Sequence, residues 1–581
     1  SVAEKISVTP SHNASAPAQL LEFSRQFPLA VSFFQALWLL FELIITTALA
    51  GWGVAALLPY GIKHIGLAGV LLTAPFLIAA MAALWTCIAV IRSVAMKRML
   101  VGRYTSGSVP IWSAQGIRYW LVEHSVRLIP WMLFEGTALV PVILRMLGAR
   151  IGRNVHFHRR TVPLSGGWDL LDIADDVTVS QEASLRIMDI KSGMYITAPI
   201  LLESGVVVGI RATVAGGTAM GAGSILAPLA ALEPGVTTGP DELWSGIPAG
   251  PSGKAEPLCS IQQTSWSEHR WTAARLLAHT AVGALKSVPF LCALAILALW
   301  NGLSLEQILE GISSSQLATS AVELALAACA ALPVTLLIEA LLARVIGRFP
   351  CGNIPLRSFT YLRVWETTSL VDSASKWLSG SLFWPLWLRM AGMRIGTNCE
   401  ISTLVDLIPG MIDIESDTFC ADGIYLASPE IRRGIVRLGK VHISRDSFFG
   451  NHAVVKIGTK LPSDILLGVC TVAEPGKIPG GSSWFGVPPF ELPRREVLDI
   501  DRSLTYNPGP VRYTTRLIWE LLRFVLPGIS AAAVAVWMGL SGAALHGSIG
   551  IIDSTVRLIV AGLAFPCALL SFVLFLKWFL L

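Results

Sequence analysis

The sequence predicts a multi-pass α-helical membrane protein. Six helices are expected to form three hairpins that carry two cytoplasmic domains, each a left-handed parallel β-helix of hexapeptide-repeat type. Three observations predict this fold class: an internal repeat of about 240 residues, six long apolar segments, and two intervening stretches of short β-runs. Only 14% of the 581 residues are charged and 53% are hydrophobic. A soluble domain carries roughly 25% charged residues, so much of this surface must face lipid.

The repeat is clearest in the motif LRMLGARIGRN at Leu144–Asn154, which returns 244 residues later as LRMAGMRIGTN at Leu388–Asn398. Three further motifs recur at a similar offset: Gly102–Tyr104 as Gly347–Phe349, Asp172–Ile173 as Asp413–Ile414, and Trp244–Pro248 as Trp484–Pro488. Four motifs in one order at one offset indicate that a whole module has been duplicated.

The apolar segments come in pairs, and each is long enough for a membrane helix of roughly 20 residues. They fall near residues 29–58, 66–91, 276–300, 317–343, 517–540 and 556–580. The pairs predict transmembrane hairpins over 27–98, 272–346 and 515–581. Basic residues flank the pairs, whereas Lys63 is the one Lys or Arg in the short loops inside them. The positive-inside rule then predicts an integral plasma-membrane protein with its N-terminus and both β-units in the cytoplasm.

Two kinds of segment follow the first and second hairpins. Residues 99–147 and 347–391 are rich in Trp and Arg and suit the lipid interface, with an ordinary buried helix as the alternative. Residues 148–250 and 392–490 show an aliphatic residue about every six positions, followed by Gly or another small residue. This rhythm favours a triangular coil of parallel strands, with a generic β-rich domain as the alternative. Residues 1–26, 251–271 and 491–514 are predicted linkers.

Several classes of function are disfavoured. The net charge is only +5 and no soluble stretch has a basic cluster, so nucleic acid is not an expected partner. The nine cysteines show no metal-ligand spacing, and no metal site is predicted. No glycine-rich nucleotide loop is present, which argues against a primary pump. The polar N-terminal residues resemble an interdomain linker, so we expect the chain to be the membrane part of a longer protein.

Five features follow one another along the chain: the hairpin, the GRY loop, the Trp/Arg-rich segment, the LGARIG motif and the WSGIPA motif. This order resembles the C-terminal membrane region of ε-poly-lysine synthetase-type nonribosomal peptide synthetases. The Trp-x-Gly-[Ile/Val]-Pro turns resemble the exit loop of hexapeptide-repeat acyltransferases. The first resemblance covers nearly the whole chain from about residue 27. It implies adenylation and carrier domains N-terminal in the same polypeptide, and 4′-phosphopantetheine on the carrier as acyl donor. No cofactor is expected on this region itself. Membrane lipids are expected partners, and assembly with a second copy of the chain is left open.

Both β-units depart from the family pattern. The family's soluble units carry a stretch with a Glu and an Asp. The first unit keeps the Asp as Asp169 and lacks the Glu, and the matching stretch of the second unit, Pro409–Asp413, keeps neither. The family's histidine loop is replaced by Arg186–Ile190 and Ser428–Arg433, which contain no His. The resemblance therefore implies that both units are degenerate and that a third unit, expected beyond residue 581 or lost, would hold the catalytic groups.

Forming an amide from a thioester requires a base for the attacking amine, and histidine suits this role near neutral pH. The candidate bases are His156 and His158 in the first unit and His442 and His452 in the second. The alternative for each is a structural histidine on the surface or at a corner of the coil.

Charged residues supply the candidate binding groups, each with a plainer alternative. Asp169 and Asp172 would bind a cationic acceptor or else cap a turn. Arg432 and Arg433 would meet the phosphate of phosphopantetheine or else form a solvated corner. Glu42 lies within the first apolar segment and would line an exit path for a polycationic product, or else pair between helices.

Three functions remain open at this point. The first is a membrane-embedded condensation region, an amide-forming acyl or aminoacyltransferase that makes a poly-lysine-like polymer from carrier-bound amino acids. The second is a non-catalytic scaffold that holds the catalytic unit and carrier at the membrane. The third is an export conduit for the product.

Overall fold

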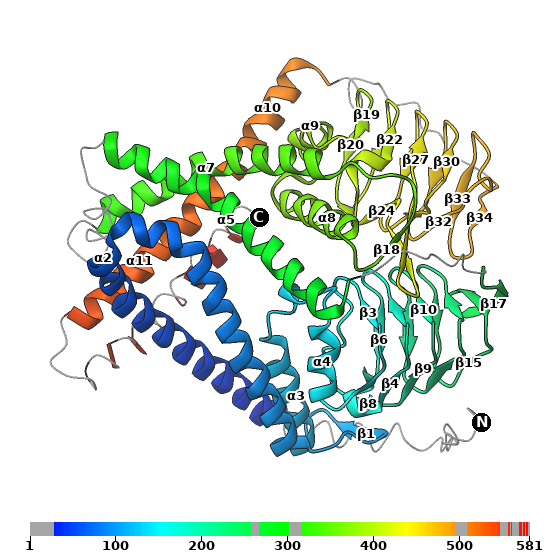
Figure 1. Ribbon diagram of the computed structural model, residues 1–581, viewed down its shortest axis with the longest axis horizontal. Helices are drawn as coiled ribbons and strands as arrows, with labels where there is room; N and C mark the ends of the chain where they lie inside the picture. The colour runs from blue at the N-terminus through cyan, green and yellow to red at the C-terminus, as the bar shows by residue number, and fades with distance from the viewer. Residues whose placement is uncertain are drawn as a thin grey trace. The chain divides into compact units, whose positions relative to one another are not determined.

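The computed structural model describes residues 28–256, 266–300, 317–493 and 508–546, with individual residues between 553 and 578. These residues fall into two compact units. Unit 1 consists mainly of Ala82–His279 and Glu339–Tyr513, and unit 2 of Leu29–Met81, Thr280–Ile338 and Thr514–Leu581. The two units are described separately below, and Figure 1 gives the element labels.

Long helices make up unit 2 and continue into unit 1. They are α2 (Pro28–Met96), α5 (Glu268–Trp300), α7 (Leu317–Ile346), α10 (Pro510–Leu521) and α11 (Leu526–His546), with a 3₁₀ turn at Leu522–Val525. Gly66 interrupts α2 with φ +68° and ψ +164°, a conformation open to glycine because it lacks a Cβ atom. Pro289 in α5 and Pro333 in α7 lie inside their helices.

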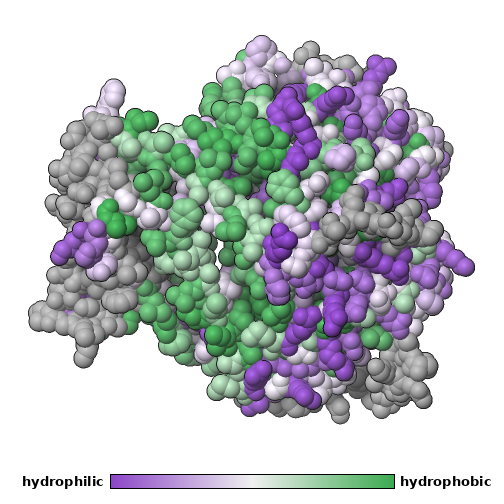
Figure 2. All heavy atoms as spheres, in the orientation of Figure 1, coloured by the Kyte–Doolittle hydropathy of each residue, from purple (hydrophilic) through white to green (hydrophobic). Residues whose placement is uncertain are grey.

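Five helical stretches of the described residues are long and apolar enough to cross a bilayer. They are Pro28–Thr46, Leu72–Val101, Glu268–Leu297, Ala321–Ile346 and Pro510–Trp537. Hydrophobic residues gather on the surface of these helices (Figure 2). Leu72 of α2 and Val345 of α7 are among the exposed apolar side chains. The predicted sixth helix at 556–580 lies largely outside the described residues, as do the loop 301–316, the linker 1–26 and most of the linker 491–514. Six helices in three hairpins therefore stays a prediction.

Helices α5 and α7 pack together in unit 2 through a small apolar cluster that includes Leu294 and Ala327. Thr335 donates a hydrogen bond to the Lys286 carbonyl at 3.5 Å. Leu294 of α5 lies near Ala327 of α7, whereas the earlier residue Lys286 of α5 contacts the later residue Thr335 of α7. The two helices therefore run antiparallel. A Cβ on Gly528 of α11 would lie 2.5 Å from Cys329 Sγ, which shows that α11 packs closely on α7.

The Trp/Arg-rich segments differ in part from the expected lipid-interface segments. They form α3 (Ala114–Arg127), α4 (Leu139–Met146), α8 (Phe359–Leu378) and α9 (Phe383–Met390) in unit 1. Four of their tryptophans are at most 7% exposed: Trp131, Trp365, Trp384 and Trp387. Arg363 caps the end of α7 by donating to the Ile346 and Arg348 carbonyls. The rings of these four tryptophans are covered by protein, so the buried-helix alternative holds for them. Trp112, Trp120 and Trp377 are half-buried, and for them the lipid interface stays a prediction.

The first β-unit, here coil 1, is three parallel sheets visited in turn by the chain (Figure 1). The first sheet contains β2 (Arg150–Ile151), β4 (Leu171–Ile173), β9 (Ile200–Leu202), β12 (Thr218–Met220) and β15 (Thr237–Thr238). The second contains β3 (His156–Phe157), β5 (Thr178–Val179), β10 (Val207–Val208), β13 (Ile225–Leu226) and β16 (Glu242–Gly246). The third contains β6 (Ser184–Arg186), β11 (Thr213–Ala215) and β14 (Ala231–Leu232). Antiparallel β17 (Ala249–Lys254) ends the coil within the predicted linker 251–271.

The second β-unit, coil 2, repeats this topology. The first sheet contains β19 (Arg394–Ile395), β22 (Ile412–Ile414), β27 (Val441–Ile443) and β30 (Lys460–Leu461). The second contains β20 (Glu400–Ile401), β23 (Phe419–Cys420), β28 (Phe448–Phe449), β31 (Leu466–Leu467), β33 (Ser483–Phe485) and antiparallel β34 (Phe490–Glu491). The third contains β21 (Leu404–Val405), β24 (Ile424–Leu426), β29 (Val454–Val455) and β32 (Val472–Ala473). The same succession of three parallel sheets in both halves follows from the repeated sequence.

Each coil also carries an antiparallel hairpin that pairs with a strand from the preceding segment. In coil 1, β7 (Met188–Lys191) and β8 (Met194–Thr197) pair with β1 (Gly107–Pro110). In coil 2, β25 (Glu430–Arg432) and β26 (Ile435–Leu438) pair with β18 (Gly352–Pro355). The hairpins occupy the stretches where the family's histidine loop was expected.

The repeated LRM motif has a definite structural role. Arg145 donates to the Ile151 and Gly152 carbonyls at 2.9 and 2.6 Å, while Leu144 is fully buried. In the second copy, Arg389 donates to the matching Ile395 and Gly396 carbonyls. The motif therefore fastens the helix before each coil to the coil's first strand.

Candidate functional site

A chain of three buried side chains joins the two coils inside unit 1. His156 Nε2 lies 3.2 Å from His158 Nδ1, and His158 Nε2 lies 3.1 Å from Asp406 Oδ2. Both histidines come from strand β3 and its end, while Asp406 follows β21 of coil 2. The three side chains, here called the His–His–Asp chain, are at most 5% exposed. The predicted histidine pair therefore occurs together, although alternation on one strand face places it in the interior.

The charge of Asp406 fixes the proton positions when both imidazoles are neutral. Burial raises the pKa of Asp406, but the charge and hydrogen bond of His158 and the charge of Arg159 outweigh it and leave the pKa below its ordinary value. A carboxylate only accepts hydrogen bonds, so His158 Nε2 donates to Asp406. His158 Nδ1 then accepts from His156 Nε2, which leaves His156 Nδ1 unprotonated.

Desolvation keeps His156 in its neutral form. Burial lowers the pKa of His156 well below its usual value, the charge of His158 lowers it further, and Asp406 only partly opposes this. A neutral imidazole with one bare nitrogen is the protonation state that a general base requires.

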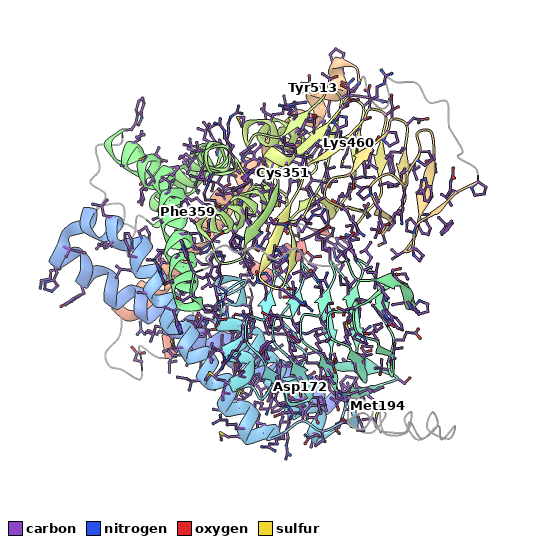
Figure 3. The ribbon with its side chains drawn as sticks, turned by 45° about the vertical axis from the view of Figure 1, so that its right-hand side comes forward. Asp172, Met194, Cys351, Phe359, Lys460 and Tyr513 are labelled. Carbon is purple, nitrogen blue, oxygen red and sulfur yellow. The ribbon has the colours of Figure 1, made fainter. Side chains whose placement is uncertain are left out.

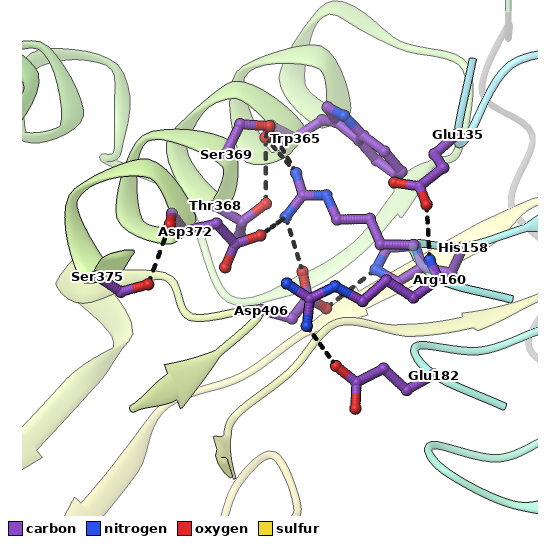
Figure 4. Close-up of polar contacts among 11 residues, drawn as sticks. Glu135, His158, Arg160, Glu182, Trp365, Thr368, Ser369, Asp372, Ser375 and Asp406 are labelled. Atoms are coloured by element: carbon purple, nitrogen blue, oxygen red, sulfur yellow. Dashed lines mark hydrogen bonds and ion pairs between the residues drawn. The ribbon is translucent and has the colours of Figure 1, made fainter. Parts of the chain in front are cut away.

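Arg159 fastens coil 1 to helix α8 beside this chain. It donates to Asp372 Oδ2 at 2.9 Å and to the Trp365 carbonyl at 2.8 Å (Figure 4). Its guanidinium also lies 4.5 Å from the centre of the Trp365 ring, a cation–π contact. Burial raises the pKa of Asp372, and the charge of Arg159 opposes that rise. The cluster is a desolvated polar junction with several possible proton sites.

Glu182 forms the next contact between the coils. Its Oε1 accepts from Arg160 at 2.8 Å (Figure 4), and its Oε2 accepts from the hydroxyl of Tyr425 at 2.8 Å. Arg211 lies 3.3 Å from the same carboxylate and 3.0 Å from His452 Nδ1. Because arginine donates, His452 Nδ1 is an acceptor and that nitrogen is already engaged. His452 therefore takes part in the junction through Nδ1, and its role as a base stays a prediction.

The predicted acceptor-binding aspartates lie outside the His–His–Asp chain. Asp169 forms a buried ion pair with Lys97, with Nζ 2.7 Å from Oδ2, and accepts from the Tyr104 amide at 2.9 Å. This pair fastens coil 1 to the end of a candidate membrane span, so Asp169 is occupied within the chain. Asp172 lies on β4 at the coil surface (Figure 3), 3.3 Å from Arg150.

The remaining candidates in coil 2 also make contacts within the chain. His442 lies between Asp413 and Glu415, 3.6 and 3.4 Å away, with its side chain 36% exposed. Arg432 donates to the carbonyls of Glu256 and Gly223. Arg433 lies at the hairpin turn with φ +46°, and its guanidinium would collide with a Cβ at Gly205. The arginine hairpin therefore docks on coil 1, and a phosphate contact by Arg432 or Arg433 stays a prediction.

Glu42 lies in the candidate span Pro28–Thr46, where its carbonyl accepts from Thr46 Oγ1 at 2.6 Å. It belongs to unit 2, whereas the His–His–Asp chain belongs to unit 1. Among the described residues, no group of three or more His, Cys, Asp or Glu side chains is arranged to hold a metal ion.

Sequence reasoning missed Asp406, Arg159 and Glu182. The one signal for Asp406 was a lone carboxylate inside the apolar run Leu404–Ile408. An isolated charge in a buried strand requires a partner, but the partner stands 248 residues away and follows no local spacing.

No protein-family model matches the chain. The chain is 27% identical over 503 residues to the delta-poly-L-ornithine synthetase of Acinetobacter baumannii (strain AB307-0294), covering 84% of this chain and 37% of that protein. The chain thus spans well under half the length of this relative.

Solved hexapeptide-repeat enzymes resemble parts of the chain. A hexapeptide-repeat containing acetyltransferase from Vibrio cholerae O1 biovar eltor, complexed with acetyl coenzyme A, is 21% identical, covers 19% of this chain and 62% of its own, and has a TM-score of 0.17. A maltose O-acetyltransferase from Clostridium difficile 630 is 13% identical, covers 28% and 98%, and has a TM-score of 0.20. With TM-scores this low, these likenesses support no inference about the chain. Across 84% of its length, however, the chain is similar to part of a poly-amino-acid synthetase.

Proposed function

We propose that the chain is the membrane-bound, amide-forming region of a poly-amino-acid synthetase of the nonribosomal type. The observation that carries the proposal is the similarity to a poly-ornithine synthetase over 84% of the chain. The hairpins, the left-handed β-helix form of the coils, their cytoplasmic position and the N-terminal adenylation and carrier domains belong to the same proposal. The polymerised residue is a basic amino acid, ornithine or lysine.

The His–His–Asp chain supplies the acid–base chemistry of this proposal. A carrier-bound phosphopantetheine arm would supply the acyl group as a thioester. His156 Nδ1 takes a proton from the attacking amine as the new C–N bond forms. The C–S bond then breaks, and the departing thiolate receives that proton from His156. His158 and Asp406 hold the His156 ring in the required tautomer.

Turnover by the chain itself tests this proposal. The chain in lipid nanodiscs is incubated with free L-ornithine and a synthetic ornithyl thioester of N-acetylcysteamine, and amide product is measured by mass spectrometry. His156→Gln should lower the rate by about 10²–10⁴-fold, the usual contribution of a general base. His124→Gln is the matched control, since His124 lies on α3 and stacks on Trp120. Equal rates in the His156 variant and the unaltered chain contradict the assignment. Loss of turnover in His442→Gln alone would move the base to coil 2.

The burial of the two histidines favours a second candidate function, a non-catalytic scaffold. His156 and His158 are only 5% and 4% exposed, as expected of residues that fasten two domains together. On this reading, His156→Gln lowers stability, and amide formation requires residues outside the chain. The two functions are therefore separated by whether the unaltered chain forms amide at all. The export conduit stays a prediction that rests on Glu42.

A further inference from the structure

A pocket of about 870 Å³ with several charged residues in its lining lies in unit 1. Its lining comes from α4, the first turns of coil 1, the start of α5 and the segment before α8. The residues that matter here are Arg153, Asn154, Asp175, Glu268 and Arg357. This volume is within the range of typical small-ligand sites.

The pocket presents groups of both charges. The guanidinium of Arg153 forms no hydrogen bond or ion pair with any residue that the structure describes. Arg357 donates to Asn154 Oδ1 and lies 3.4 Å from Glu268, whose side chain is 44% exposed. Asp175 accepts from the Arg153 amide at 2.5 Å. One unpaired guanidinium, Arg153, and the Arg357–Glu268 pair thus share the pocket with the Asp175 carboxylate.

This mixture of charges selects the chemistry of the ligand. A simple anion such as phosphate would meet the repulsion of Glu268 and Asp175, and a polycation would meet Arg153 and Arg357. A molecule that carries a carboxylate and an ammonium group a few ångströms apart can satisfy both signs. Arginine forks are well suited to the carboxylate, and the two acidic side chains to the ammonium.

The pocket adjoins the residues assigned to acid–base chemistry. Asn154 lines the pocket, and His156 follows two residues later at the start of β3. The positive charge of Arg357 is close enough to His156 to contribute to the lowering of its pKa. A ligand that neutralises Arg357 would therefore act on the base as well.

We propose that this pocket is the acceptor site, which holds the zwitterionic head group of a free α-amino acid through Arg153, Arg357, Glu268 and Asp175. The inference rests on the proposed function, because it assigns the amine-bearing substrate of the same reaction. The head group is anchored in the pocket, and the side-chain amine remains available as the nucleophile.

Binding without turnover tests the site. Calorimetry on the chain in nanodiscs compares L-ornithine with 1,4-diaminobutane, which lacks the carboxylate, and 5-aminopentanoic acid, which lacks the α-ammonium group. L-Ornithine should bind at least tenfold more tightly than either analogue. Arg153→Gln should weaken L-ornithine binding about tenfold and remove the preference over 1,4-diaminobutane. It should fold normally, because the Arg153 guanidinium forms no hydrogen bond or ion pair with the described residues. Arg394→Gln should leave binding unchanged, since Arg394 is an 84% exposed arginine of coil 2.

Three outcomes overturn the site: equal affinities for the three ligands, unchanged L-ornithine binding in both Arg153→Gln and Arg357→Gln, or displacement of L-ornithine by inorganic phosphate or phosphatidylethanolamine at equal concentration. The proposed function fails independently. If Arg153→Gln abolishes binding but the unaltered chain forms no amide, the acceptor site is supported and the catalytic assignment is contradicted. If Arg153→Gln forms amide with an unchanged KM for L-ornithine, the catalytic assignment is supported and the acceptor site is contradicted.

Discussion

His158 and Asp406 are separated by 248 residues, yet His158 Nε2 lies 3.1 Å from Asp406 Oδ2 in the buried junction between the coils. The imidazole belongs to the first copy of the repeat and the carboxylate to the second. Their contact joins the two copies through a polar pair that neither copy forms within itself. The four predictions below test this junction and the attachments around it.

Asp406→Ala should destabilise the junction strongly. Asp406 Oδ1 lies 3.7 Å from the buried guanidinium of Arg159. Removing one partner of a buried ion pair costs about 3–5 kcal/mol, because the other partner is left desolvated. Asp413→Ala is the matched control, since Asp413 is a half-exposed aspartate of coil 2 that lies 3.6 Å from His442. An exposed pair contributes at most about 1 kcal/mol. Thermal unfolding of the detergent-solubilised chain measures both variants, and equal losses would show that Asp406 is not desolvated in solution.

Stability should fall as pH drops from about 7 to 5.5. Folding lowers the pKa of His156 well below its ordinary value near 6.5. When the pH falls below about 6.5, the unfolded chain therefore binds a proton at this histidine that the folded chain does not, and the free energy of unfolding falls. The slope has a maximum of about 1.4 kcal/mol per pH unit for one proton. The pKa of Asp406 is also lowered by folding, so the stability that this carboxylate contributes is lost only at a lower pH, below about 3.9.

The raised pKa values of Asp372 and Glu366 have the opposite sign, because the folded protein then keeps a proton that the unfolded chain releases. The informative quantity is therefore the difference between the unaltered chain and His156→Asn across the same pH range. The variant should lose the decline between pH 7 and 5.5. A decline that persists unchanged in His156→Asn would assign it to other groups.

Gly136→Ala should displace α8 from the segment that precedes α4. A Cβ at Gly136 would lie 2.5 Å from the Trp365 ring, and φ there is +71°. Gly476 has φ +73° with nothing within 4 Å of its Cβ position, so Gly476→Ala measures the backbone cost alone, roughly 1–2 kcal/mol. The excess loss in Gly136→Ala measures the collision with Trp365. Similar melting temperatures for the two variants would place Trp365 elsewhere.

Lys97 and Asp169 should behave as a coupled pair. Their buried side chains lie 2.7 Å apart, so Lys97→Met alone and Asp169→Leu alone should each cost about 3 kcal/mol. The double variant should cost much less than the sum, because neither charge is then left buried without its partner. Additive losses in this double-mutant cycle would show that the two charges are solvated and independent.

Local sequence patterns were sufficient for the parts of the fold that depend on neighbouring residues. The six-residue rhythm of aliphatic side chains predicted parallel coiling, because one aliphatic per strand must point inward to fill a shared core. The strand pairings in both coils are parallel from rung to rung. Apolar length predicted membrane helices, and five of the expected stretches are long and apolar enough in the described residues.

The tryptophan-rich segments show where such patterns fail. Trp365 was expected at the lipid interface, but it is 1% exposed and is contacted by the guanidinium groups of Arg159 and Arg275. A Trp beside an Arg has the same local appearance whether the ring meets lipid headgroups or a distant arginine. Only the packing of α8 on coil 1 distinguishes these environments.

The sequence by itself determined the repeat, the apolar segments and the coiling of the strands, because each follows directly from the order and spacing of residues along the chain. It also pointed to His156 and His158 as a pair. The tertiary structure alone decided that Asp406 completes this pair, that Lys97 occupies Asp169, and that Arg432 and Arg433 dock on coil 1. These outcomes depend on which desolvated charges meet across the fold, and the partner of a buried charge is chosen by proximity in space, with no trace in local spacing.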